Sequence, residues 1–373
     1  MIDSIGAVIT VYSCLYVLVA LTITAGILRF RRQKTPDVLP SVSIVVCARN
    51  EERTIRQCIG SLIRLDYPID KTEIILVDDE SDDATRTIME EFGRGFSNIR
   101  VLSTDQEPRE LPGKQRPLNY GIRESHGEIV LVTDADCTVL PGWVKGHCAA
   151  YGNPAIGITG GVTTVSEEYR SLFARIQGAE LVSKLGIAMG SAGLGLPQTI
   201  MGNNVSFRRD AYEKCGGFRA IGSTIVEDMM LMNAVIKRTE YRLGWAGTSG
   251  SVVRTRPDST FRSIIQQRLR WLTELKNFSS FGKLCIAGEI MMEIMFIISL
   301  IVAYGNHLLP VLVGSAWLAG YCTIFITVPG SRLVDFFLVP CVIILESMYG
   351  YMLMFRIITG NTAVRWRGRV YEG

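Results

Sequence analysis

Long apolar stretches near both ends of the 373-residue sequence constrain its architecture more than any other feature. Residues 5–28 carry no charge, and a helix of this length can cross a bilayer. Three more apolar stretches follow toward the C-terminus, at residues 284–304, 308–329 and 334–355. The middle of the sequence has the composition of an ordinary globular domain, although the whole chain is 48% hydrophobic. We therefore predict an integral membrane protein with a folded domain between its membrane helices.

Basic residues flank the first apolar stretch on one side. Arg29, Arg31, Arg32 and Lys34 follow it, and no Lys or Arg precedes it. The positive-inside rule therefore predicts that the folded domain lies in the cytosol. We expect the plasma membrane as its location. A cleaved signal peptide is the alternative, but in a signal peptide the basic residues precede a shorter apolar run.

The number of spans near the C-terminus is left open by the sequence. The first of the three apolar stretches there carries Glu289 and Glu293, and the last carries Asp335 and Glu346. If all three stretches crossed the bilayer, the basic tail would lie outside the cell, against the charge rule. One of the charged stretches could instead be re-entrant or interfacial, and we favour this interpretation.

Between the apolar stretches, short apolar runs alternate with helical patterns, which is typical of an α/β fold with a mostly parallel sheet. Asn50 is predicted to cap the first helix, and Asp82 or Asp83 the second. Ligands bind beyond the carboxyl ends of the strands in such sheets. The predicted strands are residues 42–47, 73–77, 99–102 and 129–133, and the predicted helices are residues 55–63, 84–92 and 114–124.

Polar residues follow these strands where a ligand would bind. The segment Ala48-Arg49-Asn50-Glu51 follows the first strand, Asp78 and Asp79 follow the second, and Asp134 follows the fourth. No G-x-G-x-x-G follows the first strand and no Gly-Lys-Ser/Thr loop occurs, which argues against a dinucleotide enzyme and a P-loop NTPase. Carboxylates in place of glycine-rich turns indicate a nucleotide diphosphate held through a divalent metal.

Asp134 and Asp136 are the expected metal ligands. They are separated by one residue at a predicted strand end, and side chains at i and i+2 of a strand point the same way. Both carboxylates could therefore hold one Mg²⁺ or Mn²⁺ ion. A solvated strand end is the alternative interpretation.

Charge and cysteine usage exclude several other classes of protein. The net charge of +3 is too small to predict binding of a nucleic acid polymer. The nine cysteines form no C-x-x-C pair, and no His/Cys group has zinc spacing, so we expect reduced thiols.

Seven short segments carry the most specific pattern in the sequence. They are C-A-R-N-E-E at 47–52, V-D-D-E-S-D-D-A-T at 77–85, G-K at 113–114, D-A-D at 134–136, G-N-N at 202–204, E-D at 227–228 and Q-R-L-R-W at 267–271. In this order they resemble the membrane-bound, inverting family 2 glycosyltransferases, which have the GT-A fold. That family includes cellulose and hyaluronan synthases and ceramide glucosyltransferases. The resemblance covers roughly residues 40–271.

The resemblance implies a site for a nucleotide-sugar donor. Asp79 occupies the position whose acid accepts a hydrogen bond from uracil, although the family often has Gly where Glu80 stands. Asp136, together with Asp134, would hold the metal on the diphosphate. Lys114 could bind phosphate at a helix start, or could be a solvated lysine. The residues expected to bind the donor nucleotide are Ala48, Asn50, Glu51, Asp79, Lys114 and Asp134.

The resemblance also implies a catalytic base and an acceptor end. Asp228 would be the base, supported by Glu227, although acids in a first helical turn also complement the helix dipole. Gln267, Arg270 and Trp271 would close the acceptor end near the diphosphate, on an amphipathic interfacial helix over residues 261–275. The small-residue segment 190–197 is expected to be a loop.

These observations predict five segments and one main function. The segments are an N-terminal membrane helix with its basic flank (1–35), a GT-A domain (36–260), an interfacial segment (261–283), two or three membrane helices (284–357) and a basic tail (358–373). We expect inverting transfer from a sugar nucleotide, UDP-linked, to a membrane lipid or lipid-linked glycan. The W-R-G-R tail resembles endings of ceramide glucosyltransferase-like proteins. The alternatives are a processive polysaccharide synthase, a nucleotidyltransferase and an inactive membrane scaffold.

Overall fold

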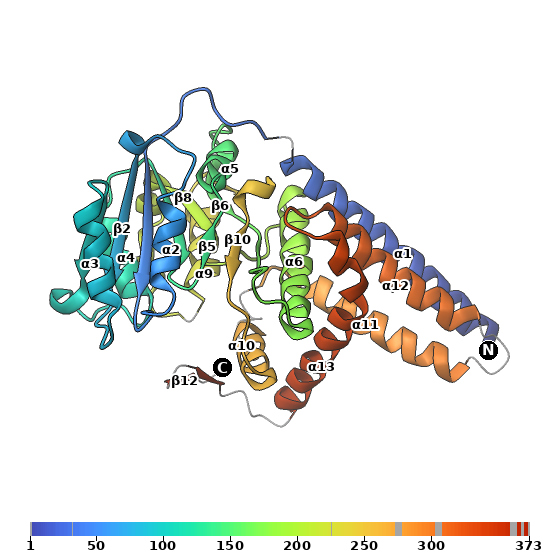
Figure 1. The fold of residues 1–373 in the computed structure, drawn as a ribbon. Helices are drawn as coiled ribbons and strands as arrows, with labels where there is room; N and C mark the ends of the chain where they lie inside the picture. The colour runs from blue at the N-terminus through green and yellow to red at the C-terminus, as the bar shows by residue number, and fades with distance from the viewer. Residues whose placement is uncertain are drawn as a thin grey trace. The chain divides into compact units, whose positions relative to one another are not determined.

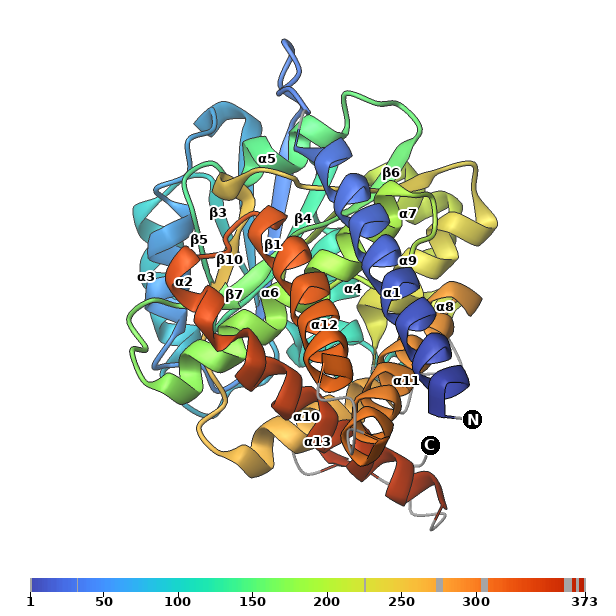
Figure 2. The same ribbon diagram turned by 90° about the vertical axis from the view of Figure 1, so that its right-hand side faces the viewer.

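The chain divides into two compact units in a computed structural model, and each is described by itself (Figures 1 and 2). We call residues Arg29–Ser166 and Thr199–Arg256 the sheet unit. We call residues Met1–Leu28, Glu167–Gln198 and Pro257–Gly373 the helical unit. The residues that the structure describes are 2–31, 33–224, 226–272, 278–302, 308–358, 364–366 and 369–371.

The sheet unit is built on a seven-stranded sheet in the order β3-β2-β1-β4-β8-β6-β9. Of these seven strands, six run in the same direction and β8 runs antiparallel between β4 and β6. The mixed α/β class and the mostly parallel sheet are thus confirmed. The strands are β1 (Val42–Ala48), β2 (Thr72–Asp78), β3 (Ile99–Ser103), β4 (Ile129–Asp134), β6 (Ile156–Gly160), β8 (Val205–Arg208) and β9 (Arg242–Trp245).

Helices and a smaller sheet complete the sheet unit. A three-stranded sheet has the order β5-β10-β7. Its strands are β5 (Thr138–Val139), β10 (Val253–Thr255) and β7 (Thr163–Val165). The α-helices are α2 (Ile55–Leu62), α3 (Thr85–Gly95), α4 (Gln115–Arg123), α5 (Trp143–Ala150), α7 (Arg209–Lys214), α8 (Gly217–Ile221) and α9 (Glu227–Arg238), and the 3₁₀ turns are η1 (Ile69–Lys71), η2 (Thr104–Gln106) and η3 (Ser249–Ser251).

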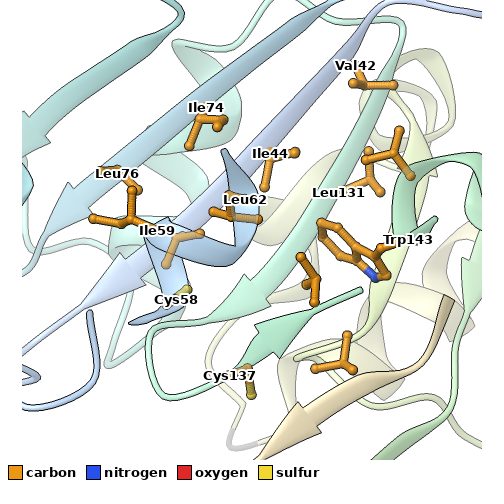
Figure 3. Packing of buried hydrophobic residues seen from close by; sticks show 14 of the residues in the cluster. Val42, Ile44, Cys58, Ile59, Leu62, Ile74, Leu76, Leu131, Cys137 and Trp143 are labelled. Carbon is orange, nitrogen blue, oxygen red and sulfur yellow. The ribbon is translucent and has the colours of Figure 1, made fainter. Parts of the chain in front are cut away.

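The core of the sheet unit forms where α2 covers the central strands. Ile59 and Leu62 of α2 lie over Ile44 of β1 and Leu76 of β2 (Figure 3), and each of these four side chains is at most 2% exposed. The side of α2 that carries its regularly spaced apolar residues therefore faces the sheet. Six of the seven residues of β1 are fully buried, because helices cover a mostly parallel sheet on both faces.

The predicted strands and helices of this unit are present with small changes at their ends. Each of the four predicted strands extends one residue further toward its carboxyl end. The prediction that Asp82 or Asp83 caps the second helix is wrong, because Ala84 precedes α3; Asp83 nevertheless accepts the N–H of Thr85, the first residue of α3, at 2.9 Å. The prediction that Asn50 caps α2 is wrong: Thr54 precedes α2, and the Asn50 side chain instead accepts the N–H of Asp82 at 2.8 Å.

The helical unit contains four segments that are long and apolar enough to cross a membrane, at Ser4–Phe30, Ser280–Val302, Leu308–Thr327 and Leu333–Met352. Apolar helices near both ends are thus confirmed, whereas the suggestion of a re-entrant stretch stays a prediction. A short hairpin follows, although Arg367 and Gly368 of the W-R-G-R tail lie outside the described residues. The elements are α1 (Ile2–Phe30), α6 (Leu172–Gly193), α10 (Phe261–Leu272), α11 (Ser280–Val302), α12 (Leu308–Thr327), η5 (Leu333–Leu338), α13 (Val339–Ile358), β11 (Val364–Trp366) and β12 (Arg369–Tyr371).

Helix α6 has no predicted counterpart, and it corrects the expected loop at 190–197. The helix continues through Gly193, so the first half of that segment is helical. A Cβ atom at Gly190 would clash with the backbone oxygen of Ile23, and one at Gly193 with that of Gly26. These glycines therefore allow α6 to pack closely against α1, as small residues do at membrane helix contacts.

Three acidic residues within the apolar helices are hydrogen-bonded to side chains of neighbouring helices, and one of them, Glu293 of α11, accepts from the Ser347 hydroxyl of α13 at 2.8 Å. Glu289 of α11 accepts from the Tyr16 hydroxyl at 2.9 Å and from the Trp317 indole at 3.3 Å. Glu346 of α13 accepts from the Tyr321 hydroxyl of α12. Helices α1 and α12 run side by side (Figures 1 and 2). Donors from neighbouring helices reduce the cost of placing carboxyl groups in an apolar environment.

Candidate active site

The carboxyl ends of three neighbouring strands form the edge on which the candidate site is built. Ala48 of β1 pairs with Asp78 of β2, and Cys47 of β1 pairs with Asp134 of β4. Asp79 follows β2 directly, and its N–H donates to the Ala48 carbonyl at 2.9 Å. Because parallel strands end at the same edge, the polar residues after them come close together.

Asp134 and Asp136 do not both belong to a strand, which corrects the argument that their side chains point the same way by strand alternation. Strand β4 ends at Asp134, and Asp136 lies in the turn that follows. Both residues are partly exposed, between the buried Ala135 and Cys137. The Cys137 thiol donates to Asp136 Oδ1 at 3.4 Å, so the turn has its own local contact.

Lys114 joins residues from three of the predicted motifs. Its ammonium group forms an ion pair with Asp134 and lies 3.7 Å from Glu227 Oε1. Burial acts to lower the pKa of Lys114, but Asp134 and Glu227 outweigh it and hold the pKa above its ordinary value. The start of α4, the end of β4 and the start of α9 therefore meet at one charged group.

Asp228 lies in the first turn of α9 with both carboxylate oxygens held by backbone N–H groups. Oδ2 accepts from Gly202 at 2.6 Å, and Oδ1 accepts from Met229 at 2.8 Å. A Cβ atom at Gly202 would lie 3.2 Å from Asp228 Oδ2, so glycine suits this close approach. The G-N-N segment thus fixes the orientation of the Asp228 carboxylate.

Asn204, the last residue of that segment, has a structural role in the core. Its Oδ1 accepts from the Trp143 indole at 2.9 Å and from His147 Nε2 at 2.8 Å. Its Nδ2 donates to the carbonyls of Val162 and Ser251. Asn204 is completely buried, and these hydrogen bonds hold the core behind Gly202.

Asn50 and Glu51 connect the loops that follow β1 and β2. Asn50 has a φ of 57°, a left-handed conformation that Asn adopts more readily than most residues. Its N–H donates to Ser81 Oγ at 3.1 Å, and the N–H of Glu51 donates to Thr85 Oγ1 at 2.7 Å. Their predicted contact with a nucleotide stays a prediction.

Sequence reasoning missed Gln115 and Arg116, which follow Lys114 directly. Gln115 is buried; its Nε2 donates to the Gly222 carbonyl at 2.8 Å, and its Oε1 accepts the Thr224 N–H at 3.2 Å. It thereby holds the segment leading to Glu227. Arg116 pairs with Asp79 at 2.7 Å. The available signal was their position after the Gly-Lys pair, at the start of a helix.

Gln267, Arg270 and Trp271 lie on α10, in the helical unit, whereas Asp134 and Asp228 belong to the sheet unit. Their neighbour Arg268 donates to the Gln267 side chain and lies 4.3 Å from the centroid of the Trp271 ring. The predicted helix over 261–275 is present to residue 272, and residues 273–277 lie outside the described part of the chain.

The carboxylates at the strand ends fit a divalent cation that also binds the phosphate oxygens of a ligand. Among the described residues, no three His, Cys, Asp or Glu side chains gather into a metal-binding group. Asp134 and Asp136 supply hard carboxylate oxygens, and Mg²⁺ is commonly held by one or two carboxylates plus phosphate oxygens. The pair therefore suits a metal ion bound together with a diphosphate.

Comparison with known proteins identifies the class of domain. Residues 43–216 match the family model described as "Glycosyl transferase family 2". The matched region includes the three strand ends and Lys114 and stops before Glu227.

Curated relatives are similar over about half of this chain. The chain is 31% identical over 239 residues to "Probable glycosyltransferase YdaM" of Bacillus subtilis, covering 62% of this chain and 54% of the relative. It is 28% identical over 190 residues to "Glycosyltransferase AglE" of Haloferax volcanii (49% and 57%). It is also 28% identical over 203 residues to "Beta-monoglucosyldiacylglycerol synthase" of Trichormus variabilis (54% and 42%). The chain spans about half the length of the curated relatives it matches.

A solved structure supports the fold assignment. The mannosyltransferase PcManGT from Pyrobaculum calidifontis, in complex with GDP-Man and Mn²⁺, is similar with a TM-score of 0.56 over 97% of each chain. The sequence identity is 16%. Together with the family match, this likeness shows that the sheet unit has the GT-A fold.

Proposed function

We propose that this chain transfers a sugar from a UDP-linked donor to a membrane lipid or a lipid-linked glycan, with inversion at the anomeric carbon. One observation carries the proposal most directly. Lys114 and Asp134 lie in the region that matches the family model, and Lys114 bridges Asp134 to Glu227 of α9, so three separate motifs converge at the carboxyl edge of the sheet. This is the edge where ligands bind in open α/β sheets.

Asp228 is the proposed base. Inversion needs one group that takes the proton of the acceptor hydroxyl as its oxygen attacks the anomeric carbon opposite the leaving diphosphate. The Gly202 and Met229 N–H groups hold the Asp228 carboxylate in a single orientation, which suits a positioned base. Glu227 supports the site by its charge beside Lys114.

The donor side is assigned to the residues at the strand ends. Asp134 and Asp136 would hold Mg²⁺ or Mn²⁺, which neutralises charge on the leaving diphosphate when bound. Lys114 places a further positive charge beside Asp134, where it can attract a phosphate oxygen. Asp79 would bind the base, and Ala48, Asn50 and Glu51 would line the nucleotide from the loop after β1.

The acceptor is proposed to be a lipid. The relative named as a monoglucosyldiacylglycerol synthase supports this class, and so do four helices long and apolar enough to cross a membrane. Gln267, Arg270 and Trp271 are the proposed acceptor-end residues. The basic residues after α1 support a cytosolic sheet unit at the plasma membrane.

A processive synthase is the second candidate. The chain is 29% identical over 179 residues to "Poly-beta-1,6-N-acetyl-D-glucosamine synthase" of Staphylococcus epidermidis, covering 47% of this chain and 41% of the relative. Three candidate spans after the sheet unit can form a groove open to lipid but hardly a channel for a polymer. This argument favours transfer of one or a few sugars.

A donor screen on detergent-purified protein tests the proposal. UDP- and GDP-sugars are supplied with Mg²⁺ or Mn²⁺ and membrane lipids, and the released nucleotide is measured, with Asp228→Asn as the inactive control. Labelled donor should give a compact product that organic solvent extracts. A high-molecular-weight product would identify a polymerising synthase, and equal release by the Asp228→Asn protein would contradict the proposal.

A further inference from the structure

Asp335 of η5 is a buried carboxylate that two arginines hold, one on each oxygen. Its side chain is 6% exposed. Arg175 of α6 donates to Oδ1 from Nε at 2.9 Å and from Nη2 at 2.6 Å. Arg332 directly precedes η5; its Nε donates to Oδ2, and its Nη2 lies 2.5 Å from the same oxygen. These three residues of the helical unit form what we call the arginine–aspartate cluster, which carries one positive charge in excess.

Both guanidinium groups of the cluster keep N–H donors that the carboxylate does not use. A guanidinium group has five N–H donors. Among the described residues, none accepts a hydrogen bond from the Nη1 atom of Arg175 or of Arg332. The two side chains are 29% and 34% exposed, so a ligand can reach them. The buried carboxylate therefore holds two accessible guanidinium groups together, with donors left for a second anion.

Exposed apolar side chains lie in the same two elements as the cluster. On η5, Leu333 is 78% exposed and Phe337 is 80% exposed. On α6, Leu172 is also exposed, and it lies three residues before Arg175 on the same side of the helix. A candidate membrane span, Leu333–Met352, begins at the first of these residues. The cluster thus lies at one end of a span, with apolar side chains beside it.

We propose that Arg175 and Arg332 together bind the phosphate of an anionic phospholipid of the surrounding bilayer. The end of a membrane span lies at the level of the lipid headgroups, where basic side chains meet phosphate. A guanidinium group binds phosphate through two parallel N–H···O bonds. One excess positive charge complements a phosphodiester, which carries one negative charge. The exposed Leu333 and Phe337 contact the acyl chains of the same lipid layer.

The role of Asp335 in this site is to hold the arginines in place before a lipid binds. Two guanidinium groups repel each other, and the carboxylate between them offsets this repulsion. Ordering both side chains in advance lowers the entropy cost of binding. The excess charge favours an anionic lipid over a zwitterionic one, whose headgroup brings its own positive charge. The site goes beyond the proposed function, because it needs neither a sugar donor nor a residue of the sheet unit.

Thermal unfolding of the full chain in detergent, with added lipid, tests the proposal. Phosphatidylglycerol should raise the Tm of the unmodified protein, and phosphatidylcholine should raise it less. Arg175→Gln and Arg332→Gln each remove one guanidinium group and leave Asp335 paired with the other, so both variants should fold. In each variant, the phosphatidylglycerol concentration that gives half of the Tm shift should rise about tenfold or more, as the loss of a hydrogen bond between charged groups implies.

Arg170→Gln is the matched control, because Arg170 is exposed just before α6 and is not part of the cluster. This variant should respond to phosphatidylglycerol as the unmodified protein does. An unchanged response in both Arg175→Gln and Arg332→Gln would overturn the proposal. So would an equal Tm shift with glycerophosphoglycerol, the headgroup without acyl chains, which would identify a site for a soluble phosphate ester. The comparison of the two lipids needs no variant, and equal Tm shifts of the unmodified protein with both would also overturn the proposal.

Discussion

Arg268 and Glu180 form a buried, two-point ion pair between α10 and α6 of the helical unit. Arg268 Nε lies 2.8 Å from Glu180 Oε1, and Nη2 lies 2.5 Å from Oε2. The side chains are 2% and 0% exposed. Burial acts to raise the pKa of Glu180, but Arg268 and Lys184 outweigh it and lower the pKa to about 2. The pair thus fixes the helix that carries Gln267 and Trp271 to its neighbour.

Removing one partner of this pair should destabilise the protein strongly. In Glu180→Gln the Arg268 charge stays buried without its counter-charge, and such losses cost about 3–5 kcal/mol. Thermal unfolding in detergent should show a clearly lowered Tm, whereas Glu168→Gln, at an exposed position, should not. The double variant Glu180→Leu/Arg268→Leu should recover part of the loss, because no buried charge of this pair is left unpaired. Lys184, which also pairs with Glu180 at 2.7 Å, is partly exposed and keeps access to water. An unchanged Tm in Glu180→Gln would show that water reaches Arg268.

Asp228→Asn should keep donor binding and lose transfer by ~10²-fold or more, because an amide cannot take the acceptor proton. The Asn Oδ1 can still accept the Gly202 N–H, but its Nδ2 cannot accept the Met229 N–H, so the Tm of the variant is measured to check folding. Turnover and nucleotide affinity are measured on the same preparation, with the exposed Glu240→Gln as control. Loss of donor binding with normal turnover at saturation would give Asp228 a structural role instead.

Activity should require a divalent cation and Asp136. A chelator should abolish nucleotide release, and added Mg²⁺ or Mn²⁺ should restore it. Asp136→Asn should keep the Tm of the unmodified protein and lose nearly all turnover, together with the effect of the metal on nucleotide affinity. Full activity of this variant in chelator would contradict the metal assignment.

Protonation of His147 should destabilise the protein at acidic pH. Burial lowers the pKa of His147 to about 4, below the ordinary value of about 6.5. The folded state therefore has its full stability above pH 6.5 and loses roughly 3 kcal/mol as the pH falls from 6.5 to 4. Thermal unfolding between pH 7.5 and pH 4 should show this loss, and His147→Gln should reduce it. His126→Gln, at a side chain that is 78% exposed, should leave the loss of stability unchanged. An equal dependence of stability on pH in the two variants would contradict this role of His147.

The sheet unit should face the cytosol. Ser97 is exposed in the segment between α3 and β3, and Ser4 is exposed near the start of α1. In intact cells, an impermeant thiol reagent should label Ser4→Cys and leave Ser97→Cys unlabelled until the membrane is permeabilised. The unmodified chain measures the background from its nine cysteines. Labelling of Ser97→Cys in intact cells would reverse the predicted orientation.

The sequence by itself determined the elements and the edge on which the site is built. Apolar runs bounded by polar residues predicted four strands, and each is present with one more residue at its carboxyl end. Asp79 and Asp134 come to one edge because parallel strands end together, so their placement follows from the strand pattern. The uncharged length of residues 5–28 was likewise sufficient to predict a helix long enough to cross a membrane.

The tertiary structure alone decided which side chains meet. Lys114 forms ion pairs with Asp134 and Glu227. Arg116 forms an ion pair with Asp79. Arg268 pairs with Glu180, which lies 88 positions away in the sequence. Such pairs depend on how distant elements pack, and no local periodicity encodes them. The conformations of Asn50 and Asp136 were missed for the same reason, because loop contacts set them. Helix α6 was missed because it is buried on most sides and shows no single apolar face.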